Sequence, residues 1–173
     1  MRIAYTMAPG RGDTDLLLAA CAERLQLQGL RVCGTVQINS DREDCDPCDM
    51  DVRVLPDGPV LRISQSLGRH ARGCRLDPSA LETAVGLAAA ELAGGADVLI
   101  VNKFGKHEAE GRGFRDVIAE ALSRDIPVIV GLNALNKPAF LAFTEGLADP
   151  VAPDVAALLD WVDAVDGPSR SVA

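Results

Sequence analysis

The start of the chain contains the feature that most constrains the fold: a short apolar strand, a turn rich in Pro and Gly, and then a helix. The strand occupies residues 3–7 and the turn residues 8–12, and apolar residues at helical spacing follow from Leu16. The first backbone N–H groups of a helix have no acceptor inside the helix, so this end of it attracts anions. The sequence therefore predicts a strand–turn–helix unit with an anion site at the turn.

The same turn can be compared with the phosphate-binding loop template Gly-x-x-x-x-Gly-Lys-Ser/Thr. When the second glycine of the template is aligned with Gly12, Met7 stands at the first glycine, Asp13 at the lysine and Thr14 at the hydroxyl. A lysine at that position neutralises phosphate charge, whereas a carboxylate repels it. The turn thus keeps the outline of the template and inverts its charge.

The rest of the chain alternates strands with helices, which predicts an α/β fold with a doubly wound, mainly parallel sheet flanked by helices. Residues 96–101 form the continuous apolar run expected of a central strand. Two short β runs around a Pro-Asp-Gly-Pro turn, residues 51–55 and 60–63, predict an added β-hairpin. One domain is expected over residues 1–166, with a flexible C-terminal tail at residues 167–173. Further strands are expected at residues 30–38 and 126–132. The first helix should end at Gly29, and Asp77 should cap a helix at residues 78–93. Other helices are expected at 114–123 and 154–165, with a short one that contains Phe140 and Phe143.

Composition and charge narrow the classes of function. Hydrophobic residues make up 48% of the chain and aromatic residues only 3%, so the core must consist of aliphatic side chains between helices and a sheet. The net charge of −8, from 25 acidic and 17 basic residues, argues against a nucleic-acid partner and against an anionic membrane surface. No apolar run is long enough to insert into a membrane and no leader is visible, so we expect a cytoplasmic protein.

The 5 cysteines are expected to be reduced thiols. Cys21 and Cys33 lie within a predicted helix and a predicted strand, where cysteine behaves as a small buried hydrophobe. Cys45 and Cys48 have the Cys-x-x-Cys spacing of a metal or redox site, and Cys74 is a candidate third ligand. Surface thiols without a metal are the alternative.

Polar residues also follow the predicted central strand, at the end where ligands bind in open α/β sheets. We expect this loop and the turn to follow adjacent parallel strands, so that an oxyanion binds between them. Pairing of Asp13 with a lysine across the site is a further hypothesis, and a solvated loop without a ligand is the alternative. The candidate anion- or nucleotide-binding residues are Gly10, Arg11, Gly12, Asp13, Thr14, Asn102, Lys103, Lys106, Arg112 and Arg75, of which Arg112 or Arg75 would close the pocket. No catalytic residue is assigned.

Several separated segments resemble, in the same order, the small P-loop nucleoside triphosphatases of the thermophilic nucleotide-phosphatase type. Residues 9–16 match their Pro-Gly-x-Gly-Lys-Thr-Thr-Leu turn, and residues 28–34 match their Glu-Arg-Gly-x-x-Val-x-Gly segment. Residues 102–108 match their Asp-Glu-Ile-Gly-Lys-x-Glu signature. The resemblance covers most of the chain and implies a P-loop fold.

A closer resemblance is to an uncharacterised bacterial P-loop-like family that is associated with molybdate-transport loci. It is carried by residues 45–50, 73–77 and 102–115. This resemblance implies a biological setting, and with it a transport-associated partner protein or a homo-oligomer as the kinds of assembly to consider.

The departures from the enzyme pattern determine the expected chemistry. In an active P-loop enzyme the lysine neutralises phosphate charge and the acidic pair after the central strand holds Mg²⁺. Here Asp13 replaces that lysine, and Asn102 and Lys103 replace the pair, which makes both Walker motifs degenerate. The resemblance therefore implies a non-hydrolytic binding or accessory protein for a small anionic ligand: phosphate, a nucleotide or an oxyanion such as molybdate. The alternatives are a nucleoside-triphosphate hydrolase with unconventional residues and a thiol-based metal or oxometal carrier.

Overall fold

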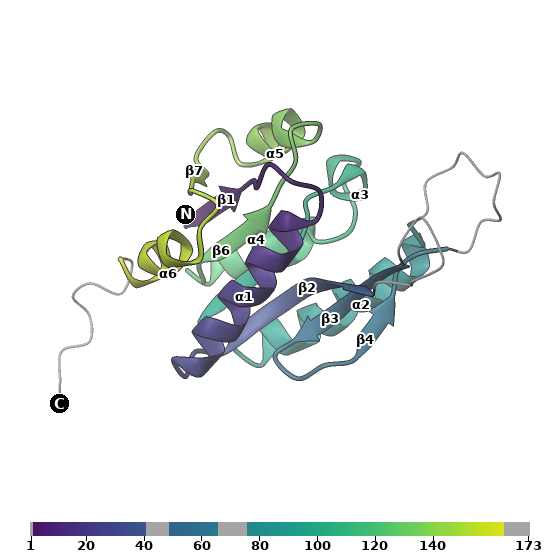
Figure 1. Cartoon of the computed structure of the whole chain (residues 1–173), viewed down its shortest axis with the longest axis horizontal. Helices are drawn as coiled ribbons and strands as arrows, with labels where there is room; N and C mark the ends of the chain where they lie inside the picture. Colours follow the sequence, from purple (N-terminus) through teal and green to yellow (C-terminus); the bar gives the residue numbers. More distant parts are fainter. Residues whose placement is uncertain (1, 41–48, 66–75, 165–173) are drawn as a thin grey trace.

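The computed structural model describes residues 2–40, 49–65 and 76–164, and these residues form a seven-stranded sheet with the order β4-β3-β2-β5-β6-β1-β7 (Figure 1). The strands are β1 (Ile3–Thr6), β2 (Val32–Ser40), β3 (Asp49–Leu55), β4 (Val60–Arg62), β5 (Val98–Val101), β6 (Val128–Gly131) and β7 (Asp149–Pro150). The helices are α1 (Asp13–Leu27), α2 (Pro78–Ala93), α3 (Lys106–Ala109), α4 (Arg115–Ser123), α5 (Lys137–Phe143) and α6 (Val155–Asp163).

The strands β2, β5, β6, β1 and β7 run parallel to one another, and β5 lies in the middle of the sheet. All four residues of β5 are buried, as are those of β1 and β6. An uninterrupted apolar run suits a strand that helices cover on both faces. The predicted α/β fold with a mainly parallel sheet is therefore confirmed, and so is the prediction that β5 is its central strand.

The added hairpin is confirmed, and it forms one edge of the same sheet. β3 pairs antiparallel with β2 on one side and with β4 on the other. The turn after β3 is closed by two backbone bonds, from Gly58 N to Val54 O at 2.9 Å and from Val54 N to Pro59 O at 3.0 Å. β2 extends to Ser40, beyond the predicted end, because β3 pairs with it along its whole second half.

Helices cover both faces of the sheet (Figure 1). On one face, Leu18 and Leu25 of α1 and Leu158 of α6 pack against Ile100 and Ile129 of the sheet. On the other face, a second cluster joins the sheet to α2, α4 and α5 through side chains that include Leu92, Leu99, Ile118, Val130 and Phe140. The aliphatic core predicted from the composition is thus divided into two layers.

Two short elements are absent from the sequence-based expectations. α3 has only four residues, too few to show a helical period, and β7 has two residues that pair with Ala4 and Tyr5 of β1. Both depend on neighbours that are distant in sequence. The predicted helix ends are confirmed: Gly29 follows α1 with φ 86°, and the Asp77 side chain accepts from Ser79 N and Ala80 N at the start of α2.

Three of the predictions fall outside the described residues. They concern Arg75 as an anion ligand, Cys45, Cys48 and Cys74 as metal ligands, and the tail at residues 167–173. Within the described part of the chain, no helix is both long enough and apolar enough to cross a membrane.

Candidate functional site

The candidate site lies at the C-terminal ends of β1, β6 and β5. The sequence-based expectation was that the turn after β1 and the loop after β5 follow adjacent strands. That expectation is wrong, because β6 lies between β1 and β5. The loop after β6 therefore takes part in the site as well.

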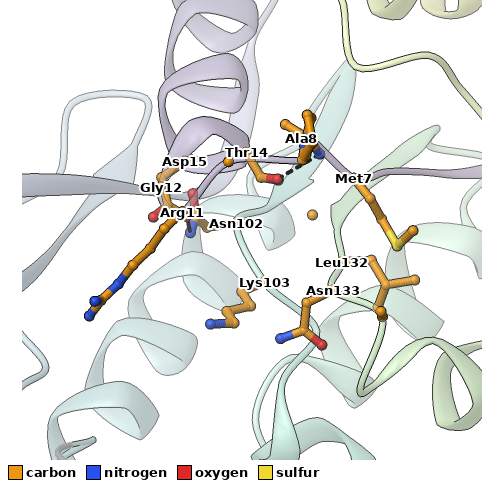
Figure 2. A pocket seen from close by; sticks show the side chains of 14 residues that line it. Met7, Ala8, Arg11, Gly12, Thr14, Asp15, Asn102, Lys103, Leu132 and Asn133 are labelled. Atoms are coloured by element: carbon orange, nitrogen blue, oxygen red, sulfur yellow. Dashed lines mark hydrogen bonds between the residues drawn. The ribbon is translucent and has the colours of Figure 1, made fainter.

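A cavity of about 690 Å³ opens between these three connections, and we call it the turn cavity (Figure 2). Among its lining residues are Gly10, Arg11, Gly12 and Thr14 of the turn and Asn102 and Lys103 after β5. Those residues were named from the sequence, and the structure brings them together. The lining also includes Met7, Ala8, Pro9, Asp15, Gly131, Leu132, Asn133 and Ala134.

The turn is shaped by Gly12 and Thr14. Gly12 precedes α1 with φ 84°, a left-handed conformation that glycine adopts without strain. The hydroxyl of Thr14 accepts a hydrogen bond from Ala8 N at 3.0 Å, which Figure 2 draws as a dashed line. This bond joins the first residue of the turn to the first turn of α1. Asp15 N and Leu16 N donate to Gly12 O, which starts the helix. The first turn of α1 consequently faces the cavity.

Asn102 joins the turn to the central strand. Its Nδ2 donates to Asp15 Oδ1 at 2.8 Å, and its Oδ1 accepts from Gln37 N at 2.9 Å. The residue is 5% exposed, so both polar ends of the amide are satisfied by protein groups inside the fold. Sequence reasoning missed Asp15, because a contact between residues 15 and 102 depends on the tertiary fold.

The loop after β6 passes very close to the end of β5. A Cβ placed on Gly131 would lie 2.0 Å from Asn102 O, so only glycine fits there, and Phe104 N donates to Gly131 O at 2.9 Å. This approach places Asn133 in the cavity wall. Asn133 was not among the candidate residues, although its position directly after a predicted strand was a usable signal.

The charges around the turn differ from the expected pairing. Asp13 is exposed, it is not part of the cavity lining, and its carboxylate lies against the α-carbon of Gly10. Among the described residues no ion pair joins Asp13 to either lysine, and Lys106 Nζ lies 3.6 Å from Glu110 Oε1. The hypothesis of an Asp13–lysine pair across the site is therefore wrong. Figure 2 shows Lys103 and Asn133 opposite the turn, and the guanidinium of Arg11 extending away from it.

Arg112 and Lys106 lie outside the turn cavity. Arg112 pairs with Glu110 at 2.6 Å and lines a separate cavity that also contains Glu82 and His107. Lys106 lines another, more apolar cavity next to the turn cavity. The prediction that Arg112 closes the anion pocket does not agree with this geometry, because α3 directs the arginine towards α2 and α4.

Buried carboxylate contacts hold the segment between β5 and α4. Glu108 is 3% exposed, and its carboxylate accepts from Gly105 N at 2.8 Å and from Phe114 N at 3.3 Å. Glu82 of α2 contacts His107 Nε2 at 2.7 Å and accepts from Gly113 N at 3.1 Å. These contacts fix the backbone that carries Lys103 and Lys106.

The two described cysteines are buried, as predicted. Burial raises the pKa of the Cys21 thiol to about 12 and raises that of Cys33 above its usual value as well. Neither is therefore an activated thiolate. Within residues 2–40, 49–65 and 76–164, no three His, Cys, Asp or Glu side chains are grouped so that they could hold a metal ion.

Comparison with solved structures supports the fold. The solution structure of a human cancer-related nucleoside triphosphatase has a TM-score of 0.66 and 22% identity, over 99% of this chain and 100% of that one. The crystal structure of THEP1 from the hyperthermophile Aquifex aeolicus has a TM-score of 0.64 and 16% identity, with the same coverage. The chain therefore shares its fold with these two structures.

Comparison of sequences gives a relative and a family. The molybdenum import ATP-binding protein ModC 2 of Bradyrhizobium diazoefficiens is 35% identical over 148 residues, which are 84% of this chain. The chain spans only 16% of the length of that relative. A family model described as "Protein of unknown function (DUF2478)" matches residues 3–161, and the chain belongs to that family.

Proposed function

We propose that this protein binds a small oxyanion in the turn cavity and does not hydrolyse nucleoside triphosphates. The observation that carries the proposal is the convergence of the first turn of α1, Lys103 and Asn133 on one cavity of about 690 Å³, with the carboxylate of Asp13 outside its lining. This convergence supports a binding site for phosphate, the phosphate groups of a nucleotide, or an oxyanion such as molybdate.

Electrostatics favours an anion in this cavity. The N-terminal end of α1 places the positive end of the helix dipole at the cavity, although Asp13 N and Asp15 N donate to Gly10 O and Gly12 O. Lys103 adds a formal positive charge, and the Asn133 amide can donate a hydrogen bond. Asp15 is the carboxylate in the lining, and Asn102 donates to one of its oxygens. The exposed position of Asp13 reduces its repulsion, because water screens the charge.

Catalysis of hydrolysis lacks its usual charged groups at this site. Phosphoryl transfer depends on positioning and on electrostatic stabilisation of the transferred group. The lysine position is occupied by Asp13, and the position of the acidic pair by Asn102 and Lys103. The acidic pair that holds Mg²⁺ in P-loop enzymes is reduced here to one carboxylate in the lining, Asp15, and one of its oxygens accepts from Asn102 Nδ2. These exchanges support the view that both Walker motifs are degenerate.

The choice among oxyanions is guided by the matched relative. Its name describes a molybdenum import ATP-binding protein, so molybdate and the similar ion tungstate are the first ligands to compare with phosphate and ATP. We extend the proposal to a transport-associated role, in which the chain acts as an accessory to a molybdate importer. The candidate carrier site at Cys45, Cys48 and Cys74 is a separate proposal that elemental analysis of the purified protein would test.

Binding is tested by thermal shift with phosphate, sulfate, molybdate, tungstate and ATP. A ligand at 100 times its Kd should raise Tm by about 5 °C or more. Lys103→Ala should weaken binding about tenfold, because it removes one charge-assisted contact. Arg53→Ala, an exposed charge on β3, is the matched control and should bind like the wild type. If no anion shifts Tm, or if the two variants behave alike, the proposed site is wrong.

Hydrolysis is tested by phosphate release from ATP and GTP in the presence of Mg²⁺. Release is expected to stay at background, whereas turnover that Thr14→Ala abolishes would establish an unconventional hydrolase. Asp13→Lys should strengthen phosphate binding without creating turnover, since it restores only one of the two missing charged elements.

A further inference from the structure

A second cavity of about 400 Å³ adjoins the turn cavity, and we call it the apolar cavity. Its apolar wall is formed by side chains from separate parts of the fold, among them Val52 of β3, Ile63 after β4, Leu81 of α2 and Phe114 before α4. A pocket of this size, with an apolar wall and a few polar groups, is typical of small-molecule sites.

The two cavities share one wall. Asn102, Lys103 and Asn133 line both of them, so a molecule that occupies the turn cavity can continue past Lys103 into the apolar cavity. On the apolar side, Lys106 and Asn136 add polar groups at the rim. The charged and apolar cavities therefore lie side by side along Lys103, and a ligand that reaches past this side chain would meet two chemically different surfaces.

The apolar half serves no purpose for a bare oxyanion. Phosphate or molybdate would occupy only the turn cavity, and the half-buried apolar side chains of the second cavity, among them Met50 and Leu81, would stay in contact with water. Leu135, which lines the apolar cavity, is 85% exposed, and a large apolar side chain so exposed at the edge of a pocket gains free energy when a ligand covers it.

We infer that the ligand is an organic phosphomonoester with an apolar ring, whose phosphate lies in the turn cavity and whose ring lies in the apolar cavity. This inference rests on the proposed anion site and adds the chemical class of its ligand. Lys103 is central to it, because its ammonium contacts the phosphate while its aliphatic stem packs beside the ring.

The experiment compares three probes on the full chain by calorimetry: inorganic phosphate, 1-naphthyl phosphate and 1-naphthol. We expect 1-naphthyl phosphate to bind about tenfold more tightly than phosphate, a ratio that corresponds to burial of roughly 60 Å² of apolar surface. Naphthol should bind more weakly than 1-naphthyl phosphate, because it lacks the charged half.

Variants then assign the ring to its cavity. Leu81→Trp fills the apolar cavity and should remove most of the advantage of 1-naphthyl phosphate while phosphate binding stays unchanged. Leu135→Ser should reduce that advantage by about threefold, and its exposed position leaves the fold intact. Leu147→Ser is the matched control, since Leu147 is also exposed, at 61%, and lines neither cavity.

The outcomes separate this inference from the proposed function. If phosphate binds and 1-naphthyl phosphate binds no more tightly, the ring assignment is wrong and the anion site stands. If 1-naphthyl phosphate keeps its advantage in both Leu81→Trp and Leu135→Ser, its ring lies elsewhere and the inference also fails. If neither phosphate nor 1-naphthyl phosphate binds, the anion site itself is wrong. Naphthol binding as tightly as 1-naphthyl phosphate would overturn the two-part ligand.

Discussion

The turn between β1 and α1 and the connection between β5 and α4 lie at the same edge of the sheet, but they are built differently. The turn is largely exposed, and the described side-chain bond that closes it is the one from Ala8 N to Thr14. The connection contains Glu108 and His107, which are 3% and 6% exposed and bonded to backbone or to Glu82. The turn therefore offers groups to a ligand, whereas the acidic residues of the connection satisfy the protein itself.

Charge alone would suggest that the carboxylate of Glu108 serves a ligand, and the structure corrects that interpretation. Glu108 belongs to the segment that resembles the acidic signature of P-loop enzymes, yet its carboxylate accepts from Gly105 N and Phe114 N. Buried backbone donors need such partners, so the carboxylate is structural in this fold. The following predictions test the contrast from the largest expected effect to the smallest.

Glu108→Ala should lower the free energy of unfolding by about 3 kcal/mol, because the buried N–H of Phe114 and the partly buried N–H of Gly105 lose their acceptor. Urea denaturation monitored by circular dichroism measures the change. Glu110→Ala is the control, since Glu110 directly follows the same short helix with its carboxylate at the surface, where ion pairs contribute little. Equal effects of the two variants would show that the connection is not held by its buried carboxylate.

Gly113→Ala should destabilise the protein by about 2 kcal/mol more than Gly111→Ala. Both glycines have positive φ, at 62° and 90°, so both variants carry the backbone strain. A Cβ at Gly113 would lie 2.2 Å from Glu108 Oε1, whereas at Gly111 nothing lies within 4 Å. The same urea titration gives the difference, and its absence would mean that Glu108 moves aside without loss.

Thr14→Ala should have the smallest effect, a loss of about 1 kcal/mol, because it removes one partly exposed hydrogen bond to Ala8 N. Hydrogen exchange locates the change: protection should fall in the turn and the start of α1 and stay constant at Gly105 and Phe114. A loss of protection in the connection as well would show that the two regions are coupled, for which Asn102 and Asp15 are the direct link.

Much of the fold could be predicted from local patterns. The apolar run of β5, the turn at residues 56–59 and the Asp77 cap each depend on residues close in sequence, and each appears in the structure. The short elements α3 and β7 could not be predicted, because α3 has four residues and β7 exists through its pairing with β1. The order of the strands in the sheet could not be predicted from the sequence either. Because β6 lies between β1 and β5, the loop after β6 joins the other two loops at the site.

The sequence by itself determined the class of fold, the strand–turn–helix unit and the candidate residues Gly10, Gly12 and Thr14, since these follow from apolar periodicity and from the backbone needs of a turn. Only the tertiary structure decided how the charges are used. In the fold, Asp13 lies outside the cavity lining, Asp15 accepts a hydrogen bond from Asn102, and Arg112 lines a different cavity. The physical reason is that a side chain's partner depends on distances between segments far apart in sequence, which strand order and close backbone approaches such as that of Gly131 set.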